Sequence, residues 1–316
     1  MIESFALCKH YGDIKAVDGI SFTVEPGQVL GFLGPNGAGK STTMKMLAGF
    51  LTPTSGRAKV CGFDVETQAI AAKRSLGYLP EGAPSYGEMS VRGFLEFIAE
   101  VRNIAPSERQ RRLDDTIGRL HLGGVLGQSI DTLSKGFKRR VGLAQAILHD
   151  PAVLILDEPT DGLDPNQKHE VRSLIQAMAR DKTLIISTHI LEEVHAVCDR
   201  AIIIAHGRIL ADDSPANLEA RSRYHQAVSL SCENPKAAQE LLTRINDVAS
   251  VVIDPQGGRV TAFPRKGRAI FPAVVEALKQ QQFAVREIAL EQGRLDEVFR
   301  QITQAAPVGA NVSEAA

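Results

Sequence analysis

The sequence predicts an α/β fold: a parallel-sheet core with an antiparallel β subdomain and a helical insertion, followed by a small α+β domain at the carboxyl end. Three observations support this prediction. Strand-length apolar runs separated by helical patterns recur between residues 29 and 205. A glycine-rich turn at residues 34–39 joins the first of these runs to a helix. After about Arg221 a second alternation of strand and helix patterns begins.

Length and charge limit the classes of protein to which the chain can belong. At 316 residues it exceeds one typical domain, which predicts a core of roughly 220 residues and a smaller appendage. Lys and Arg total 36 against 37 Asp and Glu. A net charge of -1 provides no overall field to attract nucleic acid or anionic lipid, so no nucleic-acid partner is expected.

The cysteines and the apolar segments exclude further classes of protein. The four cysteines form no Cys-x-x-Cys pair, which predicts free thiols in a reducing cytosol rather than a disulfide framework or a zinc site. The longest apolar runs have strand length, so the chain is not expected to span a bilayer itself.

The amino-terminal two thirds contain the elements of the core in order. Alternating residues from Phe5 to Val24 predict antiparallel strands around a turn at Tyr11-Gly12-Asp13. Val29 to Leu33 predicts a buried strand, and Ser41 to Ala48 predicts the helix that follows it. Amphipathic helices are expected at Val91 to Ile104 and Ser107 to Leu120, and further buried strands at Val153 to Leu156, Thr183 to Ser187 and Ile202 to Ala205.

The carboxyl-terminal part has the order β-α-β-β-α-β, which is typical of a ferredoxin-like unit. Its predicted elements are strand Gln226 to Ser231, helix Lys236 to Arg244, strand Val248 to Asp254, turn Gln256-Gly257-Gly258, strand Arg259 to Phe263, helix Arg268 to Gln280 and strand Phe283 to Ile288. A last amphipathic helix is expected at Leu295 to Thr303. The tail from 305 to 316 has too little apolar surface to predict an ordered structure.

The turn after the first core strand fits the phosphate-binding pattern G-x-x-x-x-G-K-[ST]. Its residues are Gly34, Pro35, Asn36, Gly37, Ala38, Gly39, Lys40 and Ser41. Glycines let main-chain N–H groups point at a β-phosphate, and the helix that starts near Lys40 adds its positive end. Lys40 would neutralise phosphate oxygens and Ser41 would offer its hydroxyl to Mg²⁺, while Thr42 is expected to contact the nucleotide. The pattern therefore predicts a nucleoside triphosphate site.

Two acids end the apolar strand that starts at Val153. Asp157 would hold Mg²⁺ through water, and Glu158 is suited to align or deprotonate the attacking water. An acidic helix cap is the alternative, and the phosphate loop upstream disfavours it. No Asn-Lys-x-Asp segment for guanine occurs, so adenine is the expected base and ATP the expected ligand.

The segment Leu133-Ser134-Lys135-Gly136-Phe137 resembles the ABC signature, whose commoner form is Leu-Ser-Gly-Gly-Gln. The Thr160-Asp161-Gly162-Leu163-Asp164 turn and His189 after a strand complete the resemblance, so residues from about Ile2 to Leu218 resemble one whole ABC nucleotide-binding domain. The domains expected are accordingly 1–220 for ATP binding, with a helical insertion at about 84–135, and 221–304 as an accessory domain.

The resemblance implies two such domains facing each other head to tail, as a homodimer or as a pair with a similar ATPase. Ser134 and Gly136 would grip the γ-phosphate of the partner's ATP, and Asp164 would help to form the dimer interface. Tyr11 would stack on adenine and His189 would touch the γ-phosphate. Taken alone, a tyrosine before a strand favours packing and a lone histidine favours an ordinary surface or core position.

The basic run Lys135, Lys138, Arg139 and Arg140 also has two interpretations. Basic clusters can bind nucleic acid. Directly after Ser134 this run is better explained as a charged helix face near the nucleotide.

The sequence departs from the family pattern at Glu81, where most members have Gln. A carboxylate there can serve the same metal. The change resembles ABC exporter ATPases of the gliding-motility, nitrous-oxide-reductase maturation and drug-resistance types, which work with separate permeases. Leu295-Asp296-Glu297-Val298-Phe299 is similar to a short motif at the end of such subunits. For the extension itself, a stability or dimerisation module is favoured over a regulatory binding site.

The resemblance implies an ATP-hydrolysing subunit at the cytoplasmic face of the inner membrane, bound to an integral-membrane permease. Glu158, His189 and Lys40 would be its catalytic residues. The loop from Glu81 to Arg92 is expected to couple it to the permease, with Gly82, Pro84 and Gly87 interrupting regular structure. Tyr86, Met89 and Val91 are the candidate apolar anchors, and local packing is the alternative for all three. A soluble ABC ATPase of translation or DNA repair is the main alternative, and a scaffold without catalysis is a third.

Overall fold

The computed structural model describes residues 1–82, 86–254, 258–265 and 267–305. Some sequence predictions concern positions outside the described residues, namely Pro84, Gln256, Gly257 and the tail beyond residue 305. Internal contacts divide the described residues into two compact units, Met1–Asp213 with 303–305, and Ser214–Ile302. The expected domain boundary near residue 220 stays a prediction.

A six-stranded sheet forms the centre of the first unit, in the order β10-β9-β3-β8-β7-β6. Its strands are β3 (Val29–Leu33), β6 (Leu76–Leu79), β7 (Val153–Asp157), β8 (Thr183–Thr188), β9 (Arg200–Ala205) and β10 (Arg208–Asp213). All neighbours are parallel except β10, which is antiparallel to β9. Leu33 lies opposite Thr188, and Asp157 lies opposite Ser187. The carboxyl ends of β3, β7 and β8 therefore meet at one edge, and the segments that follow them do too.

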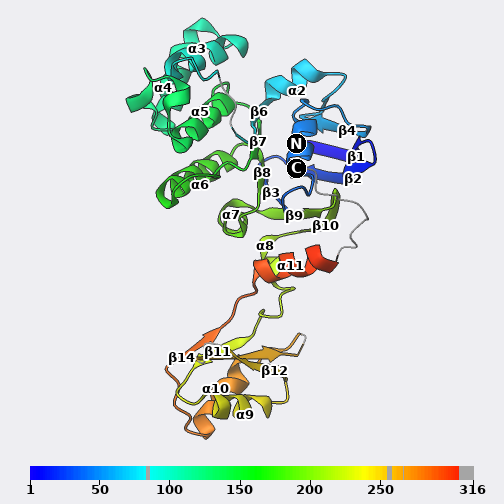
Figure 1. Cartoon of the computed structure of the whole chain (residues 1–316), viewed down its shortest axis with the longest axis vertical. Helices are drawn as coiled ribbons and strands as arrows, with labels where there is room; N and C mark the ends of the chain where they lie inside the picture. Colours follow the sequence, from blue (N-terminus) through cyan, green and yellow to red (C-terminus); the bar gives the residue numbers. More distant parts are fainter. Residues whose placement is uncertain (83–85, 255–257, 266, 306–316) are drawn as a thin grey trace. The chain divides into compact units, whose positions relative to one another are not determined.

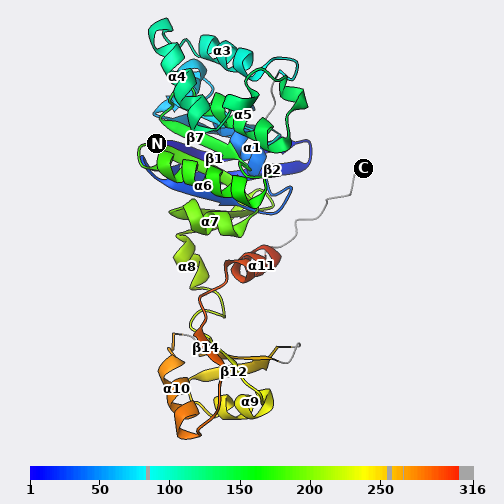
Figure 2. The ribbon, with the colours of Figure 1, turned by 90° about the vertical axis from the view of Figure 1, so that its left-hand side faces the viewer.

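A second, antiparallel sheet has the order β2-β1-β4-β5. Its strands are β1 (Ile2–Tyr11), β2 (Ile14–Val24), β4 (Ser55–Val60) and β5 (Phe63–Asp64). The turn expected at Tyr11-Gly12-Asp13 joins β1 to β2, as predicted. In Figure 1 this sheet lies on one side of the central sheet, and α6 and α7 lie on the other side. In Figure 2 these two helices lie in front of the central sheet. Ile20, Phe32 and Met44 are among the buried side chains of the core that includes both sheets.

Some helices of the first unit begin where a polar side chain caps them. Ser90 accepts a hydrogen bond from the N–H of Gly93 at 3.1 Å and starts α3, and Asp164 accepts one from Gln167 at 3.0 Å and starts α6. The helices are α1 (Lys40–Leu47), α2 (Ala69–Ser75), α3 (Val91–Val101), α4 (Pro106–Arg119), α5 (Lys135–Ile147), α6 (Pro165–Ala179) and α7 (Leu191–Val197), with short 3₁₀ turns at Gly123–Val125 and Ile130–Thr132. Helices α3 and α4 confirm the predicted helical insertion.

Val91 was expected to be an apolar anchor for a partner, and that expectation is wrong. Its side chain is fully buried in the first turn of α3, because it lies on the apolar face of this amphipathic helix with Leu95. Tyr86 remains exposed, at 61%, and its ring packs edge-on against Phe97, which is itself partly exposed.

From Val228 onward the second unit has the element order predicted from the sequence, whereas the short helix before it was not predicted. It contains α8 (Pro215–Glu219), β11 (Val228–Ser231), α9 (Pro235–Thr243), β12 (Val248–Ile253), β13 (Arg259–Pro264), α10 (Phe271–Gln280), β14 (Glu287–Leu290) and most of α11 (Leu295–Ala305). The antiparallel sheet has the order β12-β13-β11-β14. The first strand along the chain, β11, therefore lies between β13 and the last strand, β14. This is the ferredoxin-like arrangement.

Residues of the Leu295 to Phe299 motif tie α11 to the start of the second unit. Leu295 and Val298 are buried. The carboxylate of Glu297 accepts hydrogen bonds from the hydroxyl of Ser222 and, at 3.1 Å, from the N–H of Arg223. The motif thus has a structural role within this unit.

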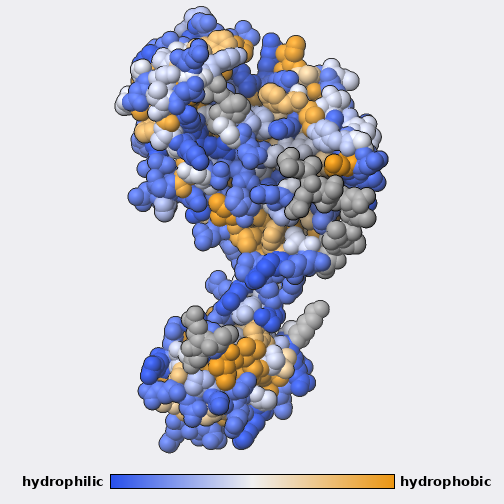
Figure 3. All heavy atoms as spheres, in the orientation of Figure 1, coloured by the Kyte–Doolittle hydropathy of each residue, from blue (hydrophilic) through white to orange (hydrophobic). Residues whose placement is uncertain are grey.

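The face of the molecule in Figure 3 is mostly hydrophilic, with apolar atoms in separate patches. Among the described residues, no helix is long and apolar enough to cross a membrane.

Candidate nucleotide site

The turn from Gly34 to Gly39 follows β3 at the sheet edge, where two glycines are required by their surroundings. A Cβ on Gly34 would lie 2.4 Å from the main-chain oxygen of Ile204. Gly39 has φ 104°, and a Cβ there would lie 2.4 Å from the oxygen of Ala16. Only glycine fits these positions, so the turn can curl tightly into the start of α1. The exposed residues of the turn are Pro35, Asn36 and Gly37.

Lys40, the first residue of α1, directs its ammonium group into this turn. The side chain is buried, and its Nζ donates hydrogen bonds to the oxygens of Gly34 at 2.8 Å and Pro35 at 3.2 Å. The same atom lies 3.7 Å from Oε1 of Glu158. A single cation therefore links the end of β3 with the end of β7.

Asp157 ends β7 and is fully buried. Its Oδ1 accepts a hydrogen bond from the hydroxyl of Ser187 on β8. Its Oδ2 is buried and has no hydrogen-bond partner in the described part of the chain. A buried carboxylate oxygen without a protein donor is costly unless a cation or water meets it. Asp157 therefore suits the Mg²⁺ role that the sequence indicated.

Glu158 has a left-handed backbone, with φ 52°. For a residue with a side chain this conformation is strained, and such strain is common at functional sites. The Glu158 N–H donates to the main-chain oxygen of Ser187 at 3.1 Å and to its hydroxyl at 3.2 Å, which holds this conformation. As a result the carboxylate is directed between Lys40 and His189.

His189 follows β8, and its Nδ1 lies 2.6 Å from Oε2 of Glu158. The imidazole is about half exposed, whereas the Glu158 side chain is only 12% exposed. The structure therefore brings the three predicted catalytic residues, Lys40, Glu158 and His189, into one cluster.

The predicted metal ligands lie close to this cluster. The hydroxyl of Ser41 donates to Oε2 of Glu81 at 3.4 Å. Glu81 comes two residues after β6, the neighbour of β7, so the departure from Gln leaves an acid beside the phosphate loop. Hard oxygen ligands of this kind are those that Mg²⁺ prefers. Thr42 follows on α1 and is partly buried.

Arg139 is the main residue that the sequence interpretation placed wrongly. It was expected on a charged helix face, but it is buried. Its guanidinium donates to the main-chain oxygens of Pro80 at 2.9 Å, of Pro159 at 3.3 Å, and of Asp157 and Glu158. Burial lowers the pKa of Arg139, and the charge of Asp157 opposes that shift. One guanidinium thus satisfies the carbonyls of Asp157, which ends β7, and of the two residues after it.

A second buried carboxylate was also missed. Glu193 on α7 accepts hydrogen bonds from the hydroxyls of Thr160 and, at 2.7 Å, of Thr188. Burial raises the pKa of Glu193, and the hydrogen bond from Thr188 opposes this shift. Glu193 fixes the turn after Glu158 to the end of β8, just before His189.

Four residues assigned by resemblance have local roles in this structure. Ser134 caps α5 by accepting from Phe137 at 3.4 Å, and Asp164 caps α6. A Cβ on Gly136 would lie 2.3 Å from Oε1 of Gln167, the end of a flexible side chain on α6. Tyr11 ends β1, is 51% exposed, and has the Lys9 ammonium over its ring. Their roles toward nucleotide stay predictions.

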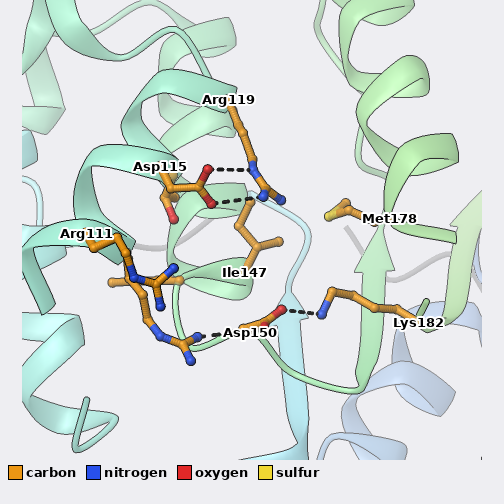
Figure 4. Close-up of a pocket in the computed structure, with 10 residues that line it drawn as sticks. Arg111, Asp115, Arg119, Ile147, Asp150, Met178 and Lys182 are labelled. Atoms are coloured by element: carbon orange, nitrogen blue, oxygen red, sulfur yellow. Dashed lines mark hydrogen bonds and ion pairs between the residues drawn. The ribbon is translucent and has the colours of Figure 1, made fainter. Parts of the chain in front are cut away.

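A separate hollow of about 150 Å³ lies between α4, α5 and the start of β8 (Figure 4). Arg119 pairs with Asp115, and Lys182 pairs with Asp150 at 2.5 Å. Because these lining charges are already paired, the hollow is a poor anion site compared with the Lys40 cluster.

Comparisons with known proteins agree with the geometry. The ABC transporter family model matches residues 17–161. The chain is 38% identical over 226 residues to the probable multidrug ABC transporter ATP-binding protein YbhF of Escherichia coli (strain K12), a match covering 70% of this chain but only 38% of that protein. It is 35% identical over 243 residues to the Nod factor export ATP-binding protein I of Rhizobium meliloti, covering 77% of this chain and 72% of that one.

A solved structure described as the ATP binding subunit of an ABC transporter matches with a TM-score of 0.65 and 28% identity, covering 69% of this chain and 92% of that chain. The predicted fold class is thereby confirmed. The chain belongs to the ABC transporter family of ATP-binding proteins.

Proposed function

We propose that this chain binds and hydrolyses ATP to power an ABC exporter through a separate membrane permease. One observation carries the proposal: Lys40, Glu158 and His189 converge at the edge of the parallel sheet, beside a buried Asp157 whose Oδ2 has no hydrogen-bond partner among the described residues. The names of the relatives, which refer to multidrug transport and Nod factor export, support an export role.

ATP binding would use the phosphate loop and the start of α1. Main-chain N–H groups of the turn and the positive end of α1 attract phosphate, and Lys40 adds a full charge. Lys40 Nζ now donates to two carbonyl oxygens of the turn, so it lies where phosphate oxygens would arrive. Tyr11 would provide a stacking surface for adenine.

Ser41, Asp157 and Glu81 would hold Mg²⁺, which when bound offsets the phosphate charge during hydrolysis. Glu158 would align the attacking water and accept its proton, because its carboxylate is held by Lys40 on one side and His189 on the other. His189 is exposed enough to contact the γ-phosphate as well.

The active form would be a head-to-tail dimer, either of two copies or with a similar ATPase. Ser134 is the N-cap of α5, and a helix amino terminus is an anion site. Ser134 and Gly136 would therefore contact the partner's γ-phosphate, with Asp164 at the interface.

The permease would hold the chain at the cytoplasmic face of the inner membrane. Tyr86 and Phe97 form an exposed aromatic pair on the helical insertion, which is the type of anchor that partner helices bury. Met89 lies nearby in sequence and is half-buried. This surface follows the Glu81 segment, so it can respond to the nucleotide.

Membrane fractionation with and without a co-expressed ABC permease tests the proposal against a soluble role. We expect the chain in the membrane fraction only when the permease is present, and Tyr86→Asp with Met89→Asp should return it to the soluble fraction with ATPase activity retained. Recovery with ribosomes or DNA regardless of the permease would favour the translation or repair alternative.

A further inference from the structure

The β1–β2 hairpin brings together three side chains that the nucleotide site does not use. Cys8 and His10 come from β1 and Asp18 comes from β2. One ligand atom from each, the Cys8 sulfur, a His10 ring nitrogen and an Asp18 carboxylate oxygen, lies within 4.8 Å of the other two. We propose that Cys8, His10 and Asp18 bind Zn²⁺.

The donor set favours zinc over the harder cations. A thiolate, an imidazole and a carboxylate are all common zinc ligands, and three protein ligands with water in the fourth position form an open zinc site. Zinc–ligand bonds of about 2.0–2.3 Å place tetrahedral ligand atoms about 3.3–3.8 Å apart. The three atoms need to approach by only about an ångström to reach this spacing.

Irregular pairing of β1 explains how these side chains meet. The register with β2 shifts between Leu7 and Lys9 and again between Lys9 and His10. Such bulges redirect side chains and are common beside functional sites. The shifts bring Cys8 and His10 of β1 close to Asp18 of β2.

The surroundings of the three groups suit a bound metal. The Nε2 atom of His10 is buried and has no hydrogen-bond partner among the residues that the structure describes. The N–H of Gly19 donates to the Cys8 sulfur at 3.1 Å, an outer hydrogen bond of the kind that orients a metal ligand. Arg208 donates to Oδ2 of Asp18 at 2.9 and 2.6 Å, an outer contact typical of ligating carboxylates.

The site is distinct from the proposed Mg²⁺ site, whose residues offer only oxygen. It is nevertheless close in sequence to nucleotide-binding elements: Tyr11 follows His10, and Ala16, two residues before Asp18, packs against Gly39. Zinc would therefore fix the hairpin that carries the expected adenine contact.

Metal titration of the full chain tests the proposal, with Co²⁺ as a spectroscopic substitute for Zn²⁺. We expect one equivalent of Co²⁺ to give a thiolate-to-metal charge-transfer band that Zn²⁺ displaces. Cys8→Ser should abolish the band, and His10→Gln should weaken Zn²⁺ binding by at least about 10- to 100-fold. Cys61→Ser, at another partly buried free cysteine, and His169→Gln, at an exposed histidine, are the matched controls and should bind as the wild type does.

A second measurement needs no variant, so it holds even if a substitution impairs folding. Zn²⁺ should protect Cys8 from alkylation in the wild-type chain while leaving the rate at Cys61 unchanged, as followed by mass spectrometry of peptides. Absence of a thiolate band, a band that persists in Cys8→Ser, or equal alkylation of Cys8 with and without Zn²⁺ would each overturn the zinc site.

Discussion

Arg139 of α5 donates a hydrogen bond to the main-chain oxygen of Pro80 at 2.9 Å, while its other nitrogens contact the carbonyls of the last residue of β7 and of the two residues after it. Pro80 immediately precedes Glu81. The helix that begins at the signature residue Ser134 is therefore joined, through one buried side chain, to both segments expected to hold the metal.

Replacing Arg139 with Gln should destabilise the chain by about 2–4 kcal/mol, because several buried carbonyls lose their donor. Lys138→Gln on the same helix is the control and should change the free energy of unfolding by no more than about 0.5 kcal/mol. Urea denaturation of both variants checks this. Equal stabilities would contradict the role of Arg139 as a buried donor.

Lys40→Ala should weaken ATP binding about 10-fold or more, since a charged donor to phosphate is lost. Lys45→Ala, an exposed position on the same helix, should bind ATP normally. Isothermal titration with ATP separates the two variants. Undiminished affinity in Lys40→Ala would refute the assignment of the phosphate site.

Ser134→Arg should abolish hydrolysis without changing ATP affinity of the isolated chain, because the cation would occupy the partner's γ-phosphate position. Mixing this variant with Lys40→Ala should restore part of the activity, since one composite site in a mixed dimer is intact. The readouts are phosphate release and sedimentation with MgATP. Normal turnover by Ser134→Arg alone would rule out the head-to-tail arrangement.

His149 should make stability sensitive to mild acid. Burial lowers the pKa of His149 to about 4 from an ordinary value of 6.5, and its Nε2 lies 3.1 Å from the oxygen of Leu76. The unfolded chain then binds a proton that the folded chain does not, so this contribution to stability is present above pH 6.5 and is lost progressively as the pH falls toward 4.

Between pH 7 and pH 5, wild-type protein should lose about 1–2 kcal/mol more unfolding free energy than His149→Gln. Denaturation curves at the two pH values measure the difference. The same pH dependence in both proteins would show that His149 titrates normally.

Local patterns were sufficient to predict much of this fold. Residues adjacent in the sequence define the strand, glycine-rich turn and helix from Val29 to Leu47, so the sequence predicts them. The same holds for the pair of acids at the end of β7. Ser187 and Glu193 were missed because their importance depends on the pairing of β7 with β8 and on the position of α7.

Arg139 on α5 is another residue whose role could not be predicted because it depends on tertiary structure. As part of a basic run it suggested a solvated face, yet it lies three residues after the buried Gly136 and four before the buried Leu143. That helical spacing was the available signal. Only the tertiary structure supplies the carbonyl groups that make burial of a guanidinium favourable.

Phosphate release by Glu158→Gln, measured together with its ATP affinity, tests the central claim most directly. Gln keeps the size of the side chain but cannot accept the proton of the attacking water. We expect turnover to fall by about 10²- to 10⁴-fold while ATP binding persists and MgATP drives the chain into a dimer. Near-normal turnover, or loss of ATP binding with the fold intact, would contradict the assignment of Glu158 as the catalytic base.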